Sequence, residues 1–246
     1  MRSEADHVGR SGPSHVVFML RAGYRLGVTR RRRARQQAKT GMHIPTVVVL
    51  SPTVRCSYNC LGCYSRGRST QDELSTLELD SPLSEAEDLS VLAVLVTRRG
   101  ALHPSWPGGP RTKPPAPPLS HHQRFACIGG DARQLPRSGN TISLVSIEGQ
   151  EDNTDGRRGP GAHEAAFLAM GRLADAGAPF GFAATTTAQN SEELGREGFV
   201  DEMIRKGCSL GFSSEYVPCD PCPNPGWVLE EDARERFRKR VLDLRS

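Results

Sequence analysis

From residue 43 onward, short apolar runs alternate with amphipathic stretches. The continuous runs at residues 45–50 and 91–96 have the length and the β-branched content of strands that are buried on both faces. Further strands are predicted at residues 143–147, 180–187 and 209–217, and helices at residues 73–89, 162–176, 191–206 and 229–244. Strands that alternate with helices predict an α/β fold with a parallel sheet, right-handed crossovers and a ligand site at the carboxyl ends of the strands.

Residues 1–42 lie outside this pattern and are polar and basic. Arg30, Arg31, Arg32, Arg33 and Arg35 form a cluster that could touch phosphate or an anionic surface. We interpret the segment as a basic N-terminal leader, either a solvated helix or a loose chain, that precedes one domain at residues 43–246. An RNA-binding or membrane-surface role for the cluster predicts steep salt dependence, but aromatic residues are not interleaved with the arginines.

A second break in the pattern covers residues 98–135. This stretch holds seven prolines, five glycines and a single acidic residue, Asp131. No strand or helix template fits it, so the chain as written predicts a disordered segment at about residues 98–136 and an absent third strand. His121, His122 and Cys127 lie here and look like a metal cluster, which is accidental if the reading frame has slipped over this stretch.

Composition narrows the classes of function. The 246 residues suffice for one domain, and a formal charge of +4 is too small to indicate a nucleic-acid binder. No apolar run approaches the roughly 20 residues of a membrane helix, or the roughly 7 to 15 of a secretory signal. We therefore expect a cytoplasmic protein that does not bind a membrane. Nucleic acid is an unlikely partner. Seven cysteines, an odd number, favour metal ligation over a disulfide framework in such a chain.

Three cysteines directly follow the first predicted strand. Cys56, Cys60 and Cys63 are spaced Cys-x3-Cys-x2-Cys. Three thiolates can hold a [4Fe-4S] cluster and leave one iron open for a ligand, whereas a structural zinc site usually takes four ligands. The alternative is a non-enzymatic protein in which the same cysteines bind zinc or a structural iron-sulfur cluster.

At these residues the sequence resembles the radical S-adenosylmethionine (SAM) superfamily. The resemblance implies a partial (β/α)6 TIM-like barrel, with the cluster loop after its first strand. It also implies SAM bound at the open iron and cleaved by one electron, from a donor such as flavodoxin or ferredoxin, to a 5'-deoxyadenosyl radical that abstracts a substrate hydrogen. The substrate is unknown, and no residue can be named as its acid or base. The family often has an aromatic residue before the third cysteine, where this chain has Gly62.

The resemblance also implies residues that orient SAM. Ser146 and Glu148 end one predicted strand, where the family holds the ribose, and Asn190 follows the next strand. For Glu148 the alternative is a polar residue that caps a turn.

The family's Gly-Gly-Glu-Pro motif is missing after the second strand, where this chain has Arg98-Arg-Gly-Ala-Leu-His-Pro104. With suitable codons, a one-base shift makes this stretch read Gly-Gly-Glu-Pro-Phe-Ile-Arg. The same shift makes residues 119–126 read Phe-Pro-Ile-Thr-Asn-Gly-Leu, which resembles the family's third strand. We therefore hypothesise a frame error over about residues 98–136, and we expect little or no turnover from the chain as written.

Near the end of the sequence, Cys208, Cys219 and Cys222 could ligate an auxiliary cluster, as some members of the family do. The alternative is a proline-rich turn with incidental thiols. Because related barrels continue beyond the last predicted helix, we also expect that the chain is truncated at its C-terminus.

Overall fold

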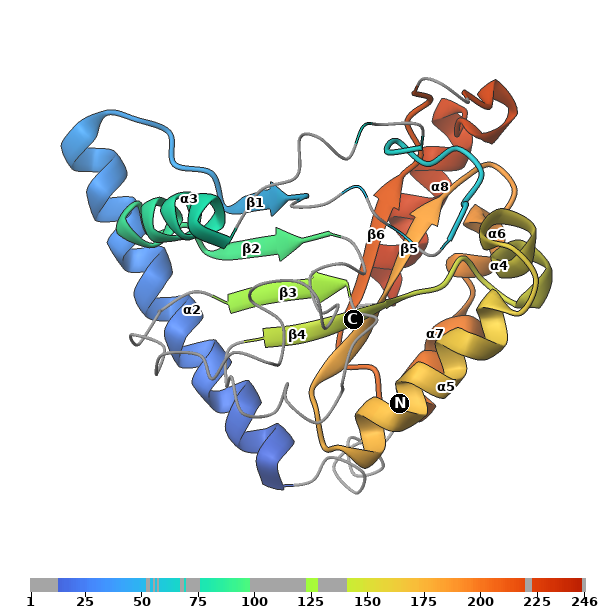
Figure 1. The fold of residues 1–246 in the computed structure, drawn as a ribbon, viewed down its shortest axis with the longest axis horizontal. Helices are drawn as coiled ribbons and strands as arrows, with labels where there is room; N and C mark the ends of the chain where they lie inside the picture. Colours follow the sequence, from blue (N-terminus) through green and yellow to red (C-terminus); the bar gives the residue numbers. More distant parts are fainter. Residues whose placement is uncertain are drawn as a thin grey trace. The chain divides into compact units, whose positions relative to one another are not determined.

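A computed structural model describes residues 13–51, 54, 56, 58–66, 69, 76–97, 123–127, 141–219 and 223–244 (Figure 1). The chain forms two compact units. The first comprises Met1–Arg55, Thr70–Ser143 and Asp175–Pro179, and the second comprises Cys56–Ser69, Leu144–Ala174 and Phe180–Ser246.

The first unit contains three parallel strands in chain order. Strand β1 (Val47–Leu50) pairs with β2 (Ala93–Val96), and β2 pairs with β3 (Gln123–Cys127). Val47 lies opposite Ala93, and Ala93 lies opposite Gln123, so the three strands begin in line. The two strands predicted at residues 45–50 and 91–96 are confirmed.

Helix α3 (Thr76–Asp88) packs on one face of these strands, through a core of Ile44, Ala86, Val91 and Val94. The helix predicted at residues 73–89 is thereby confirmed, with Pro82 inside it. The prediction that the first strand is buried on both faces is wrong, because Val47 and Val49 are about half exposed. Val48 and Leu50 pack on the core under α3, and the alternate residues of β1 lie on the opposite, open face.

Strand β3 corrects the prediction for residues 98–135. The third strand, expected to be absent, is present at Gln123–Cys127 and pairs with β2 along four registered residues. Sheet pairing satisfies backbone donors and acceptors whatever the side chains are, so a strand can form without an apolar pattern of its own. The rest of the segment expected to be disordered, residues 98–122 and 128–136, lies outside the described residues.

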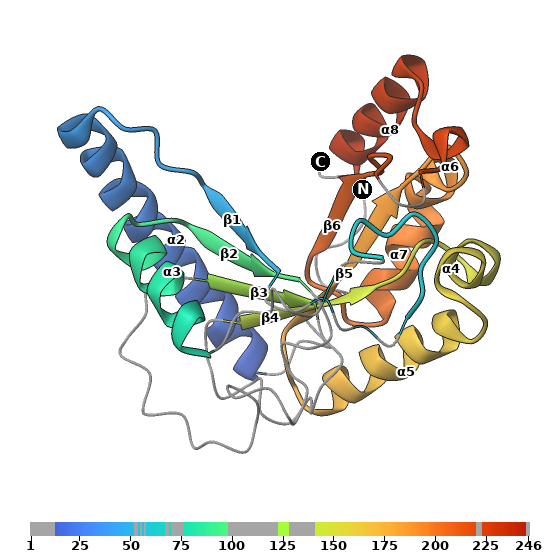
Figure 2. The same cartoon turned by 45° about the horizontal axis from the view of Figure 1, so that its top comes forward.

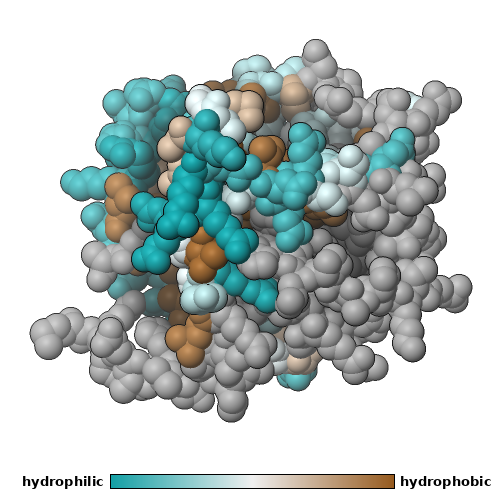
Figure 3. Space-filling view, turned by 90° about the vertical axis from the view of Figure 1, so that its left-hand side faces the viewer, coloured by the Kyte–Doolittle hydropathy of each residue, from teal (hydrophilic) through white to brown (hydrophobic). Residues whose placement is uncertain are grey.

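Helix α2 (Pro13–Thr40) is 28 residues long and carries seven arginines, one lysine and no acidic residue. Arg30, Arg31, Arg32 and Arg35 are exposed, while Arg33 Nη1 donates to Ile44 O at 3.2 Å and Thr46 Oγ1 at 2.6 Å. Figure 3 views the side of the molecule on which α2 lies, and hydrophilic side chains predominate among its coloured residues. Of the helices in the described ranges, none is long and apolar enough to cross a membrane.

The second unit contains the end of β4 (Thr141–Ser146), then β5 (Phe180–Thr186) and β6 (Gly211–Glu215). Strands β5 and β6 are parallel, with Phe182 opposite Gly211. The 3-10 turn η4 (Pro225–Trp227) and helix α8 (Glu231–Asp243) follow β6. The strands predicted at 143–147, 180–187 and 209–217 and the helix at 229–244 are all confirmed, with bounds shifted by a few residues.

The helices of the second unit differ from the prediction in two places (Figure 2). Helix α5 (Ala162–Asp175) is confirmed, but α4 (Glu151–Arg158) was not predicted, because its residues are almost all polar. The single helix predicted at 191–206 is two helices, α6 (Ser191–Leu194) and α7 (Glu197–Arg205), which are interrupted at Gly195. Phe199 of α7 packs edge-on against Phe182 of β5, with ring centroids 5.5 Å apart.

Candidate metal and cofactor site

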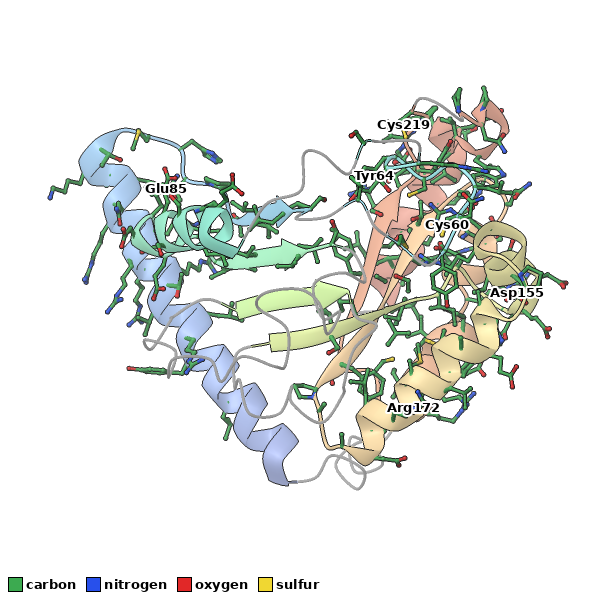
Figure 4. The ribbon with its side chains drawn as sticks, viewed as in Figure 1. Cys60, Tyr64, Glu85, Asp155, Arg172 and Cys219 are labelled. Carbon is green, nitrogen blue, oxygen red and sulfur yellow. The ribbon has the colours of Figure 1, made fainter. Side chains whose placement is uncertain are left out.

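All three cysteines of the Cys-x3-Cys-x2-Cys motif belong to the second unit. A backbone hydrogen bond ties their loop to the last turn of α4, since Leu61 N–H donates to Arg157 O at 2.8 Å. Figure 4 labels Cys60 of this loop and Asp155 of α4. Within the loop, Cys63 Sγ lies 3.1 Å from Ser65 Oγ. The end of α4 therefore fixes the loop directly beside Cys60.

Gly62, the residue before the third cysteine, packs against two aromatic rings. Its φ is +62°, and a Cβ there would lie 2.7 Å from the Tyr216 ring and 3.1 Å from the Trp227 ring. The two rings meet edge-to-face with centroids 5.5 Å apart, and Tyr216 Oη accepts a hydrogen bond from Asn224 N–H at 3.0 Å. The aromatic residue that the family often has at this position would collide with these rings.

Glu148 lies just beyond β4 and is fully buried. Its Oε1 accepts hydrogen bonds from Arg157 Nη1 at 2.6 Å and Arg158 Nε at 2.7 Å, and its Oε2 accepts one from Thr185 N–H at 2.8 Å. A buried carboxylate requires such partners, because desolvation without them is very costly. The carboxylate therefore joins the end of β4, the end of α4 and strand β5.

Asn190 is also buried and saturates a second set of backbone groups. Its Nδ2 donates to Glu148 O at 2.9 Å and to Thr185 O at 3.0 Å. Its Oδ1 accepts hydrogen bonds from Thr187 N–H at 2.7 Å and from the Thr187 hydroxyl at 3.0 Å. The structure thus brings Glu148 and Asn190 together at the carboxyl ends of β4 and β5.

Ser146 is the last residue of β4 and is half-buried. With Glu148 and Asn190 it lies at the edge of the strands where a parallel sheet binds ligands. The contacts of Glu148 and Asn190 are those of residues that hold strand ends in place. Their predicted role in orienting SAM stays a prediction.

The cysteines influence one another electrostatically. Burial raises the pKa of the Cys60 thiol, Arg158 and Arg157 oppose that increase, and Cys63 and Cys56 add to it. Cys60 is therefore within electrostatic reach of both other cysteines and of both arginines. Sequence reasoning missed Arg157 and Arg158. The signal that was available is a pair of adjacent arginines nine and ten residues after the strand-end acid, Glu148.

The donor set fits a [4Fe-4S] cluster, because three thiols from eight residues share one loop beside positive charge. In the part of the chain that the structure describes, no three His, Cys, Asp or Glu side chains are placed to hold a metal ion. The thiolates of a four-iron cluster each bind a different iron, so they are not required to meet at a single ion.

The other predicted residues are the late cysteines and those of the segment that begins at residue 98. Cys208 is a partly buried thiol whose pKa burial raises to about 12, and Cys219 lies after β6. Cys222, His121, His122 and the segment at 98–104 that replaces Gly-Gly-Glu-Pro all lie outside the described residues. The auxiliary cluster and the frame error therefore stay predictions.

The fold has clear counterparts among solved structures. SuiB of Streptococcus suis bound to S-adenosylmethionine matches with a TM-score of 0.60 at 13% identity, over 87% of this chain and 51% of that one. Methylornithine synthase (PylB) matches with a TM-score of 0.59 at 12% identity, over 89% and 68%. The anSMEcpe protein with bound AdoMet matches with a TM-score of 0.58 at 11% identity, over 81% and 57%.

These matches confirm the predicted fold class, an α/β partial TIM-like barrel of the radical SAM type. The chain spans about half the length of SuiB. No protein-family model matches the sequence, and no curated protein matches it either.

Proposed function

We propose that this protein is a radical SAM enzyme, in which Cys56, Cys60 and Cys63 hold a [4Fe-4S] cluster. Such a cluster would supply one electron for the cleavage of SAM to methionine and a 5'-deoxyadenosyl radical, and that radical would take a hydrogen atom from the substrate to give 5'-deoxyadenosine and a substrate radical. The electron comes from a small one-electron donor protein such as flavodoxin or ferredoxin.

One observation carries the proposal. The loop with the three cysteines is tied to α4 beside Arg157, in a chain whose fold matches radical SAM enzymes. Three cysteines leave one iron of such a cluster without a protein ligand, and that open position suits a chelating cofactor better than pure electron transfer.

Two residues of the chain hold the strand ends of the site in place. Glu148 and Asn190 lock the ends of β4 and β5 to each other, so these ends form a rigid edge. We propose that Ser146, Glu148 and Asn190 orient the SAM ribose and carboxylate along that edge. Precise orientation of the reacting atoms is what a site of this kind contributes to the reaction.

We expect little or no turnover of a substrate, because Arg98, Arg99, Gly100 and Ala101 stand where the family has Gly-Gly-Glu-Pro, which binds the SAM amino group. The substrate remains open. SuiB has been crystallised with its precursor peptide SuiA, and anSMEcpe with the Kp18Cys peptide, so a peptide is the first class to test.

The experiment needs no substrate. The full chain is reconstituted anaerobically with iron and sulfide, reduced with dithionite, supplied with SAM and assayed for 5'-deoxyadenosine by liquid chromatography. We expect a brown protein that releases 5'-deoxyadenosine slowly. Cys56→Ala, Cys60→Ala and Cys63→Ala should each lose the iron and the product.

Cys208→Ala is the matched control, since Cys208 is a partly buried thiol of the same unit outside the motif. It should keep both the cluster and the product. A colourless protein that binds one zinc ion would contradict the proposal and favour the non-enzymatic alternative.

A further inference from the structure

Two arginines and one buried glutamate form a cluster where β4 and α4 end. Arg157 Nη1 and Arg158 Nη2 each lie 2.6 Å from Glu148 Oε1, and Glu148 is completely buried. Because Glu148 cannot turn to solvent and also accepts from Thr185 N–H, it holds both guanidinium groups in place. The three side chains together carry one net positive charge.

The cysteine loop is hydrogen-bonded to the backbone of one of these arginines. Arg157 O accepts the hydrogen bond from Leu61 N–H, the residue after Cys60. Arg157 and Arg158 are mostly buried, with 11% and 15% of their side chains exposed, so solvent screens them only weakly. Arg157 Nε is buried and has no hydrogen-bond partner among the described residues, so one N–H is left over for a further acceptor.

We propose that Arg157 and Arg158, held by Glu148, are positioning residues that raise the reduction potential of the cluster at Cys56, Cys60 and Cys63. This inference rests on the proposed function. Reduction adds one negative charge to the cluster, and a fixed positive charge nearby stabilises the reduced state. Net charge and hydrogen bonds to sulfur are two of the features by which proteins set such potentials.

If the arginines act through their charge, the direction in which each substitution shifts the reduction potential is defined. A purely structural role defines no such direction. Removing a positive charge by Arg158→Gln should lower the potential, whereas removing the negative charge by Glu148→Gln should raise it. Arg158→Lys keeps the charge and should leave the potential close to that of the parent protein.

The test is an anaerobic redox titration of the reconstituted full chain, followed by electron paramagnetic resonance of the reduced cluster in the absence of SAM. For Arg158→Gln we expect the reduction equilibrium constant to fall about tenfold, which corresponds to a shift of about 59 mV to more negative potential for one electron. For Glu148→Gln we expect a shift of similar size in the opposite direction. Arg172→Gln is the matched control, because Arg172 is an exposed arginine of the same unit that Figure 4 places away from Cys60, and it should cause no shift.

Shifts of the same sign in Arg158→Gln and Glu148→Gln, or no shift in either, would overturn the inference while the cluster and the proposed function stand. Circular dichroism checks that each variant is folded. If Glu148→Gln does not fold, Arg158→Gln against Arg158→Lys decides, because equal shifts in these two would exclude a charge effect. A parent protein that assembles no cluster refutes the proposed function instead.

Discussion

The two units end their parallel strands in different ways. Beyond β4 and β5 in the second unit, Glu148 and Asn190 are at most 2% exposed, and their side chains make three and four hydrogen bonds to named partners. Beyond β1 and β2 in the first unit, the hydroxyls of Ser51 and Thr97 lie 2.6 Å apart, and Ser51 is exposed.

The difference follows from burial. A polar group inside the protein must have its partners in the chain, so the residues around it are tightly specified. A polar group at the surface can exchange its partner for water at little cost, so its surroundings are weakly specified. In the sequence, the residues that stand in place of Gly-Gly-Glu-Pro directly follow Thr97. The ends of β4 and β5 can therefore keep a defined structure in a chain that lacks the motif.

The largest effect should come from Asn190→Ala. It leaves Glu148 O, Thr185 O and Thr187 N–H without their side-chain partner, and we expect a loss of about 3 kcal/mol in the free energy of unfolding. Ser51→Ala, the counterpart in the first unit, should cost less than about 0.5 kcal/mol. Urea unfolding of both variants measures the two values, and equal losses would contradict the contrast between the units.

The second prediction compares two glycines that both have a positive φ. Gly62 has φ +62° and its Cβ would collide with Tyr216, whereas Gly41 at the end of α2 has φ +70° and nothing within 4 Å. Both alanine variants bear the backbone strain, about 1 kcal/mol. Gly62→Ala should cost about 2 kcal/mol more, because the rings of Tyr216 and Trp227 must shift. Thermal unfolding of the pair isolates this packing cost, and a Gly41→Ala variant that is equally unstable would show that strain alone accounts for the loss.

Features that show in a local pattern of residues could be predicted from the sequence, in both units. Apolar runs fixed the strands at Val47–Leu50 and Ala93–Val96, and the cysteine motif lies within eight residues, so both could be recognised locally. Helix α4 could not be predicted from an apolar face. It is anchored instead by Thr154, whose buried hydroxyl donates to Gly149 O and accepts from Glu148 N–H.

Strand β3 and the arginine pair depend on tertiary contacts in the same way. Gln123–Cys127 becomes a strand because β2 offers it a backbone to pair with, which side-chain patterns do not reveal. Arg157 and Arg158 follow Glu148 by nine and ten residues in the sequence, but only the fold shows that both guanidinium groups pair with its carboxylate. Residues whose role depends on distant partners are those that sequence patterns miss.

The third prediction alters the four residues that directly follow Thr97 in the sequence. Installing Gly-Gly-Glu-Pro by Arg98→Gly, Arg99→Gly, Gly100→Glu and Ala101→Pro should tighten SAM binding to the reconstituted protein about tenfold, or about 1.4 kcal/mol. The same replacement with Gly100→Gln lacks the carboxylate for the SAM amino group and serves as the control. Equilibrium dialysis measures both, and equal affinities would argue against the motif's role here.

DNA sequencing tests the frame hypothesis separately. Codons for residues 98–104 that cannot yield Gly-Gly-Glu-Pro in the shifted frame exclude it. The SAM-binding experiment stays informative in that case. It tests whether Gly-Gly-Glu-Pro at residues 98–101 binds SAM, whatever the origin of the present residues.

The smallest effect concerns Cys208, for which burial acts without compensation. Burial alone raises the pKa of this thiol from 9.0 to about 12. Above pH 9 the unfolded chain releases the proton while the folded chain keeps it, so the stability that this thiol contributes is present below pH 9 and declines as the pH rises toward 12. Between pH 8 and pH 9.5 the decline should be about 0.8 kcal/mol, and Cys208→Ala should remove that part of the pH dependence.

Urea unfolding of both proteins at the two pH values measures the difference, and Cys56→Ala, which removes an exposed thiol, should retain the parent's decline. If the stability of Cys208→Ala falls with pH as steeply as that of the parent protein, the thiol is hydrated in the folded state. The sensitivity of buried polar groups to their surroundings, seen at Glu148 and Asn190, then does not extend to the residues just before β6.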